Sequence, residues 1–212
     1  MPPPRPIWLY HFTHVEHLPG IIENGLVCDS QVGGLLTQEA GDRGIKERRR
    51  RAAVTCYPGG VVADYAPFYF APRSPMLYRI RMGGVATYNG SQRDLVYLCT
   101  TVEQLEGMGL QVVVTDRNAV LTFARFATAR AEWSADGFVD WDLMAQRDWY
   151  NDEDHPDRKE RRMAECLVHH ALPWEAVMAI GCFDDSVAES VRATVEQQTH
   201  QPDVLVRRQW YF

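Results

Sequence analysis

An isolated acid interrupts an apolar stretch in the last third of the chain. Glu165 lies in "AECLVHH", residues 164–170, directly after the basic block 158–162. The stretch is typical of a buried strand, where a carboxylate is costly unless it is paired. A structural interpretation places Glu165 at a wet strand edge, or pairs it with Arg161 or Arg162. A functional interpretation has the carboxylate hold a sugar hydroxyl or stabilise positive charge on an oxocarbenium-like carbon.

A second basic block, "KERRRR", spans residues 46–51. Four successive arginines cannot all lie on one side of a helix, so at least one should point inward or along a cleft. The Pro-, Gly- and aromatic-rich segment 57–80 follows it. Guanidinium forks bind phosphates and aromatic faces stack bases. Together these features predict a nucleotide or single-strand site, whereas a solvated helical face remains the structural alternative.

Other motifs mainly exclude functions. His11, His14 and His17 recur every third residue, but His11 falls in a predicted strand, and neither HExxH nor a nearby cysteine accompanies them. We therefore expect no metal site. "GMGLQV" lacks the third glycine of a dinucleotide fingerprint and leads into a strand. No phosphate loop and no nucleophile elbow is present.

The overall composition fits one soluble domain, which we assign to residues 1–212. The net charge of −6 argues against a general nucleic-acid coat protein, although a local basic groove remains compatible with it. Five scattered cysteines without CxxC indicate a reducing compartment. No apolar run reaches membrane-span length, and the first residues lack the features of a secretory signal. These observations predict a cytoplasmic protein.

The order of elements favours an α+β fold over a doubly wound sheet, because strands and helices do not alternate regularly. Residues 30–44 should form a loop, and 119–127 is ambiguous between helix and strand. We expect helices at 14–25, 45–54, 102–109, 141–150 and 185–198. We expect strands at 7–12, 68–71, 76–80, 94–100, 110–116, 164–170, 176–183 and 203–212.

Seven segments then match a known family in the same order over nearly the whole chain: "YHFTH", "LPGII", "ERRRRA", "DYAPFYFAPRSPMLY", "VVVTDRNAV", "MAECLV" and "RRQWYF". The chain resembles the DarT family of DNA ADP-ribosyltransferase toxins. The resemblance implies an ADP-ribosyltransferase fold, a split pair of β-sheets with flanking helices and an NAD cleft. It implies transfer of ADP-ribose from NAD to a base in single-stranded DNA, with release of nicotinamide. The base is thymine, at ring N3, in the better-known branch and guanine in another. The implied partner is a macrodomain antitoxin of the DarG type.

The same resemblance assigns residues by position. Glu165 and Arg49 match the catalytic pair: Glu165 would bond the nicotinamide ribose, and Arg49 would favour the deprotonated base or clamp phosphate. Asn118 stands where a close relative is expected to have histidine, so sequence preference should differ if it touches the base. The segment 30–53 should cover NAD, used as a substrate without a metal, and meet DNA. The implied NAD-binding residues are His11, Thr13, Gly20, Leu26, Arg49, Tyr69, Phe70 and Met76. The implied DNA-binding residues are Arg48, Arg51, Asn118 and Lys159.

Two further classes remain open. An NAD-using enzyme with another acceptor, such as guanine, RNA, protein or water, needs the same Glu165 but a different acceptor face. A non-catalytic single-strand binder uses the same arginines and aromatics and does not depend on Glu165.

Overall fold

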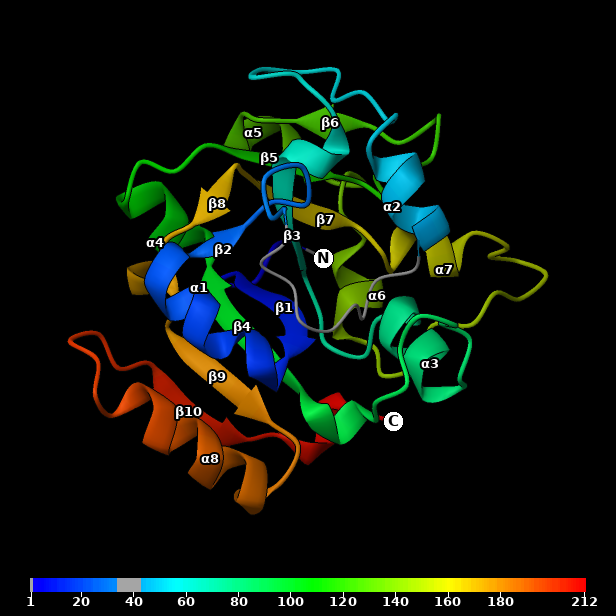
Figure 1. Cartoon of the computed structure of the whole chain (residues 1–212). Coiled ribbons are helices and arrows are strands. Elements are labelled where there is room, and N and C mark those ends of the chain that lie inside the picture. The colour runs from blue at the N-terminus through cyan, green and yellow to red at the C-terminus, as the bar shows by residue number, and fades with distance from the viewer. Residues whose placement is uncertain (1, 34–42) are drawn as a thin grey trace.

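The computed structural model describes residues 2–33 and 43–212. An eight-stranded, mostly antiparallel sheet with strand order β10-β9-β4-β1-β3-β7-β5-β6 forms its centre, and β2 and β8 form a small second sheet (Figure 1). The strands are β1 (Trp8–His14), β2 (Leu26–Val27), β3 (Tyr65–Tyr69), β4 (Leu95–Thr101), β5 (Val112–Thr115), β6 (Phe126–Ala127), β7 (Glu165–His169), β8 (Ala171–Leu172), β9 (Ala179–Cys182) and β10 (Asp203–Val206). The helices are α1 (Leu18–Asn24), α2 (Arg43–Arg49), α3 (Pro75–Arg81), α4 (Val102–Gly107), α5 (Arg130–Trp133), α6 (Trp141–Ala145), α7 (Arg158–Arg161) and α8 (Asp185–Val195).

The large sheet is divided between β1 and β3. β1 pairs with β4 along its whole length, and β3 pairs with β7 from Tyr65↔His169 to Tyr69↔Glu165. β1 and β3, in contrast, share the single register pair Tyr10↔Tyr69. The fold is therefore the expected split pair of sheets, joined at one point. Because directly opposed residues share a face, Tyr10, Tyr69 and Glu165 lie in a row across this junction.

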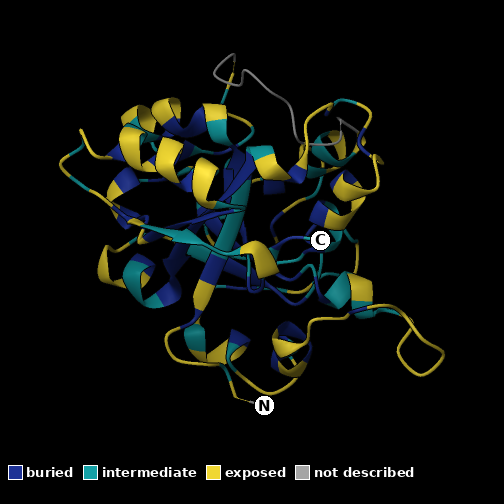
Figure 2. Cartoon of the chain, turned by 90° about the horizontal axis from the view of Figure 1, so that it is seen from below, coloured by how far each residue is buried: buried dark blue, intermediate teal, exposed yellow. Residues whose placement is uncertain are grey.

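The hydrophobic core lies mainly on the opposite face of the sheet. Its largest cluster includes Leu9, Phe68, Leu98, Cys166 and Ile180, all at most 1% exposed. Helices α1, α4, α6 and α8 bury one side against this core and expose the other, and Figure 2 shows yellow outer helix faces around the buried centre. None of the helices in the described ranges is long and apolar enough to cross a bilayer.

Most elements lie where the sequence predicts them, with one clear error. The expected strand at 76–80 is helix α3, because Ser74 caps the helix by accepting from the Leu77 amide at 3.2 Å and Pro75 occupies its first turn. Leu77 and Ile80, two of the apolar residues that suggested a strand, are instead the buried residues of this helix.

Several boundaries differ. The expected helix 141–150 ends at Ala145, and the expected strand 203–212 ends at Val206, followed by a single turn of 3₁₀ helix at Arg208–Trp210. The helix expected at 45–54 runs instead from Arg43 to Arg49, so it begins inside the expected loop 30–44. The central part of that loop, 34–42, lies outside the described residues. The ambiguous segment 119–127 contributes only the two-residue strand β6.

Candidate active site

Glu165 opens β7 and is only 1% exposed. Its Oε2 lies 2.8 Å from Arg49 Nη1, and its Oε1 accepts a hydrogen bond from the Ala119 amide at 3.2 Å. One guanidinium and one backbone donor therefore fix the two oxygens and offset the cost of burying the carboxylate. The arginine that pairs with Glu165 therefore comes from α2, 116 residues away in sequence.

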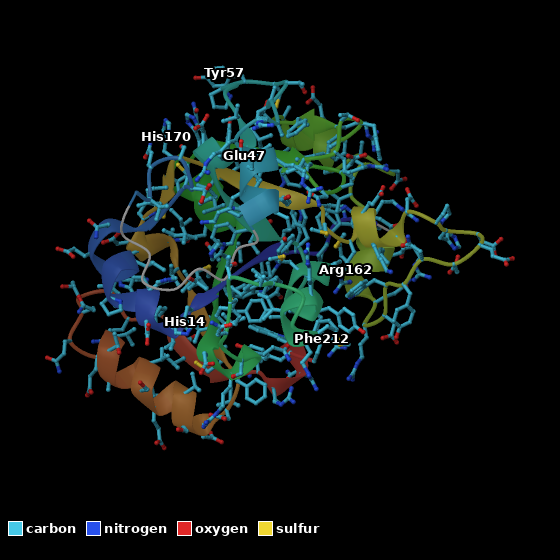
Figure 3. The ribbon with its side chains drawn as sticks, turned by 45° about the vertical axis from the view of Figure 1, so that its right-hand side comes forward. His14, Glu47, Tyr57, Arg162, His170 and Phe212 are labelled. Atoms are coloured by element: carbon cyan, nitrogen blue, oxygen red, sulfur yellow. The ribbon has the colours of Figure 1, made fainter. Side chains whose placement is uncertain are left out.

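The two arginines just before Glu165 have other partners, so the interpretation that paired either with Glu165 is wrong. Arg161 forms ion pairs with Asp140 and Asp157. Arg162, 3% exposed, donates to the carbonyls of Leu143, Met144, Gln146 and Pro72 at 2.6 to 3.2 Å (labelled in Figure 3). Burial lowers the pKa of the Arg162 guanidinium to about 10. Arg162 thus joins α6 to the loop before α3.

The backbone at Glu165 is fixed by Thr115, the last residue of β5. The Thr115 hydroxyl accepts from the Glu165 amide at 2.9 Å and donates to the Arg117 carbonyl at 2.7 Å. It therefore links the first residue of β7 to the loop that carries the Ala119 donor. Sequence reasoning missed Thr115 and Ala119. A threonine in a strand and a backbone amide have no distinguishing pattern.

That loop, residues 116–125, is organised by a buried acid that the sequence analysis also missed. Asp116 is 2% exposed and accepts from Arg125 N at 2.9 Å, Arg125 Nε at 3.0 Å and Arg117 Nε at 3.2 Å. The available signal was an aspartate directly after the apolar run "QVVVT", with an arginine next to it. The side-chain Oδ1 of Asn118 accepts from the Val120 backbone amide within this loop at 3.2 Å. The backbone N–H of Asn118 donates to the Glu160 carbonyl of α7 at 3.0 Å.

One N–H donor group of Arg49 is not used in the contact with Glu165. Its side chain is 12% exposed, and Nη2 is buried without a hydrogen-bond partner in the described part of the chain. A buried unpaired N–H is costly, so this atom suits an acceptor oxygen from a phosphate or a base. The site therefore fits an anionic nucleotide on this side of Glu165.

His11 is a neutral imidazole with a defined tautomer. Its Nδ1 lies 2.8 Å from the Pro67 carbonyl, which can only accept, so Nδ1 carries the proton. The pKa of His11 is lowered to about 4, mainly by burial; the Pro67 hydrogen bond opposes this effect, and the charges of Arg49 and His17 add to it. Nε2 is therefore an acceptor at neutral pH. Two residues along β1, the Thr13 hydroxyl lies 3.0 Å from His17 Nδ1.

Tyr69 stands opposite Glu165 in the β3–β7 register and is half-buried. Burial raises the pKa of its phenol, the charge of Glu165 adds to this, and Arg49 opposes it. The phenol is therefore a protonated donor at neutral pH. The charge of Arg49 therefore acts on the pKa of both His11 and Tyr69, and the charge of its ion-pair partner Glu165 acts on the pKa of Tyr69.

The remaining residues expected to contact NAD have different surroundings. Leu26 and Phe70 are buried in the main core, where Phe70 meets the Trp141 ring edge to face at 5.2 Å. Met76 is partly buried against a second apolar cluster, and Gly20 is exposed on α1. The structure does not bring these four into direct contact with Glu165, and their role at NAD stays a prediction.

Basic residues lie on three separate segments on the same side of the molecule. Arg48 and Arg51 are exposed at the end of α2, and Lys159 is exposed on α7. The loop 116–125 reaches α7 through Arg117, whose Nη1 lies 3.4 Å from Asp157. The Arg117 guanidinium also lies 5.2 Å from the ring of Phe123, which is 57% exposed and was not predicted. Figure 1 shows α2, α7 and this loop on the same side of the molecule.

No group of three metal-ligating side chains is found within residues 2–33 and 43–212. His14 instead caps a short helical turn, with Nδ1 accepting from the Glu16 amide at 3.3 Å.

Comparison with known proteins identifies relatives over the full length. The family described as "DarT: ssDNA thymidine ADP-ribosyltransferase" matches residues 10–212. A DNA ADP-ribosyl transferase of Thermus sp. (strain 2.9) is 36% identical over 211 residues, covering 99% of this chain and 98% of that protein. A Thermosipho africanus fusion of a DNA ADP-ribosyl transferase with a DNA ADP-ribosyl glycohydrolase is 23% identical over 92% of this chain and 47% of its own length.

Two solved structures of Thermus sp. 2.9 DarT are also similar. The complex with ADP-ribosylated ssDNA superposes with a TM-score of 0.92 at 35% identity, covering 100% of this chain and 99% of the other. The complex with NAD⁺ gives a TM-score of 0.88 at 34% identity, covering 99% and 100%.

Proposed function

The chain belongs to the DarT family of DNA ADP-ribosyltransferases, and from this membership we propose that it transfers ADP-ribose from NAD to thymine N3 in single-stranded DNA. The transfer depends on the surrounding sequence and releases nicotinamide. The observation that carries the proposal is the buried Glu165 carboxylate, held by Arg49 and the Ala119 amide at the junction of the split sheet. The NAD-bound Thermus relative supports NAD as the substrate.

On the donor side, the bond between nicotinamide and the anomeric carbon breaks, and nicotinamide leaves with the electron pair. Glu165 accepts a hydrogen bond from a ribose hydroxyl, and its charge favours the positive anomeric carbon. Because Arg49 and Ala119 fix both oxygens, the carboxylate needs little reorganisation as charge develops. His11 offers Nε2 as an acceptor to a second hydroxyl, with Thr13 beside it on β1.

On the acceptor side, thymine N3 releases its proton to solvent water, and the electron pair left on N3 forms the new bond to the anomeric carbon. A nearby cation lowers the pKa of such an N–H group, and Arg49 brings a guanidinium with the unpaired donor Nη2. The Arg49 side chain therefore favours the deprotonated base. Tyr69, opposite Glu165, lines the same face and supplies a ring for packing.

The DNA strand crosses α2, the loop 116–125 and α7. Arg48, Arg51 and Lys159 contact phosphates, since all three are exposed on this side. Phe123 provides an exposed ring for base stacking. Asn118, adjacent to the Ala119 donor, is the residue through which sequence preference differs from that of relatives.

The biological role follows from the same family. The chain is the toxin of a toxin–antitoxin pair, it acts in the cytoplasm as one domain, 1–212, and its partner is a DarG-type macrodomain that removes the mark. The Thermosipho relative, which joins a transferase to a glycohydrolase in one chain, supports this pairing.

Intact-mass spectrometry of mixed single-stranded oligonucleotides, incubated with the protein and NAD, tests the proposal. We expect a gain of one ADP-ribose, located on thymine by fragmentation. Glu165→Gln keeps the size of the side chain but loses its charge, and it should reduce transfer at least about 100-fold, roughly 2.7 kcal/mol of barrier. Glu189→Gln, at an exposed position on α8, is the matched control and should transfer normally.

The other outcomes identify the alternatives. Modification on guanine would support a DNA ADP-ribosyltransferase but would show that guanine, not thymine, is the acceptor base. NAD consumption without a mass gain on DNA would indicate another acceptor. A folded protein that neither modifies DNA nor consumes NAD, or a Glu165→Gln variant within about tenfold of the parent, would contradict the catalytic assignment.

A further inference from the structure

Helix α2 has little buried surface. From Gly44 to Arg49 no side chain is fully buried, Ile45 is half-buried, and the helix is only seven residues long. A helix of this length is marginal on its own in water, so its tertiary contacts must hold it in place. Polar contacts made by the neighbours of Arg49 therefore contribute to holding Arg49 in position.

One acid, Asp29, makes two of these contacts. Asp29 Oδ1 lies 2.8 Å from Lys46 Nζ, and its Oδ2 lies 3.4 Å from Arg50 Nη2. Lys46 and Arg50 are four residues apart and thus on one side of the helix. The Asp29 and Lys46 side chains are 15% and 19% exposed, so their attraction is screened less than that of a surface pair.

Asp29 itself is held rigidly. Its neighbours Cys28 and Ser30 donate their amides to the carbonyls of His170 and Ala63 at 2.7 and 2.9 Å, and Cys28 is 1% exposed. His170 directly follows β7, the strand that Glu165 opens. Asp29 is therefore connected to the end of β7 through the Cys28–His170 hydrogen bond, and Glu165 is the first residue of the same strand. Figure 3 labels His170 and, on α2, Glu47.

We propose that Asp29 is a positioning residue for Arg49: it binds Lys46 and Arg50 and thereby sets the guanidinium of Arg49 against Glu165. Asp29 acts through α2, because one of its oxygens faces Lys46 of that helix and the other faces Arg50, which directly follows it. A catalytic group displaced by about 1 Å can lose about 100-fold in rate. Asp29→Asn, which keeps the shape and removes the charge, should therefore reduce transfer by about 10- to 100-fold. This consequence rests on the proposed function, whereas the anchoring does not.

Hydrogen exchange tests the anchoring without any substrate. Asp29→Asn should speed exchange of the α2 amides, with no change in β4 or β9. Glu47→Gln is the matched control on the same helix: Glu47 pairs with Arg51 at 2.5 Å, but its side chain is 49% exposed. It should leave α2 exchange close to that of the parent. Equal exchange of α2 in the parent and Asp29→Asn would overturn the proposal, whatever reaction the protein catalyses.

Transfer rates test the route through Arg49. We expect Asp29→Asn to reduce the transfer rate 10- to 100-fold in the parent protein. In an Arg49→Lys background the guanidinium that Asp29 positions is already absent, so the same substitution should reduce the rate less than about threefold. Glu47→Gln should stay within about threefold of the parent. A further tenfold loss in the Arg49→Lys background would mean that Asp29 acts elsewhere. If Asp29→Asn speeds α2 exchange but the parent protein does not modify DNA, the proposed function is contradicted, whereas the proposal that Asp29 anchors α2 still holds.

Discussion

At the scale of single residues, burial fixes the protonation state of His11. The folded pKa of about 4 lies below the ordinary value of 6.5, so the unfolded chain binds a proton in this window that the folded protein does not. Stability rises with pH wherever the unfolded state binds more protons. The contribution of His11 is therefore constant above pH 6.5 and is lost as pH falls from about 6.5 to about 4.

We predict that His11→Asn, whose amide can still donate to the Pro67 carbonyl, loses less free energy of unfolding than the parent over this pH range. Urea unfolding at several pH values measures the difference. His155→Asn is the control, because the His155 side chain is 56% exposed, and its pH dependence should match the parent. Parallel pH profiles for His11→Asn and the parent would contradict a neutral buried imidazole.

The residues of the site were predictable to different degrees. Glu165 was conspicuous because a lone acid in an apolar strand needs a partner. The partner itself was not readable from the sequence, because Arg161 and Arg162 are near in the chain whereas Arg49 comes from 116 residues away. Ala119 contributes a backbone N–H, and Asp116 acts only through arginines that fold back onto it. Such contacts depend on loop geometry rather than on residue type.

At the scale of elements, periodicity located the sheet but not every helix. β4, β5, β7 and β9 followed from dense apolar runs, since buried central strands need such composition. The segment 75–81 has the same apolar character, yet Ser74 and Pro75 make it a helix. Ser74 and Pro75 indicated a helix more clearly than the apolar residues that follow them, because a strand and a buried helix of this length have similar composition.

Arg162 determines how three of these elements meet. Its guanidinium donates to carbonyls of α6, of the residue after α6 and of the Pro72 loop, while β7 begins three residues later. We predict that Arg162→Met lowers the free energy of unfolding by about 2–4 kcal/mol, because it leaves buried carbonyls unsatisfied. Arg161→Met, which removes pairs of a side chain that is 24% exposed, should cost about 1 kcal/mol or less. Urea denaturation measures both, and equal losses would mean that the carbonyl contacts contribute little.

At the scale of the whole molecule, net charge and local charge point in opposite directions. The chain carries −6 overall, yet Arg48 on α2, Arg51 just after α2 and Lys159 on α7 are all exposed, and α2 and α7 lie on the same side of the molecule in Figure 1. Helix α8, with Glu189 and Arg192, lies on the opposite side of the molecule in Figure 1. The net charge argued only against a general nucleic-acid coat protein and left a local basic groove possible, and the arrangement of α2 and α7 in space shows where basic side chains share one side of the molecule.

The salt dependence of DNA affinity tests this arrangement. Each phosphate neutralised on a single strand contributes about −0.7 to the slope of log affinity against log salt. Removing Arg48, Arg51 and Lys159 together should therefore reduce the steepness of that slope by about 2 and leave thermal stability nearly unchanged, since all three side chains are exposed. Arg192→Ala removes an exposed cation from α8 and should leave the slope as in the parent. Fluorescence anisotropy with a labelled thymine-rich oligonucleotide, titrated between low and moderate salt, gives the slopes. A triple variant with the parental slope would place the strand on another face, because counterions are released only where cations meet phosphates.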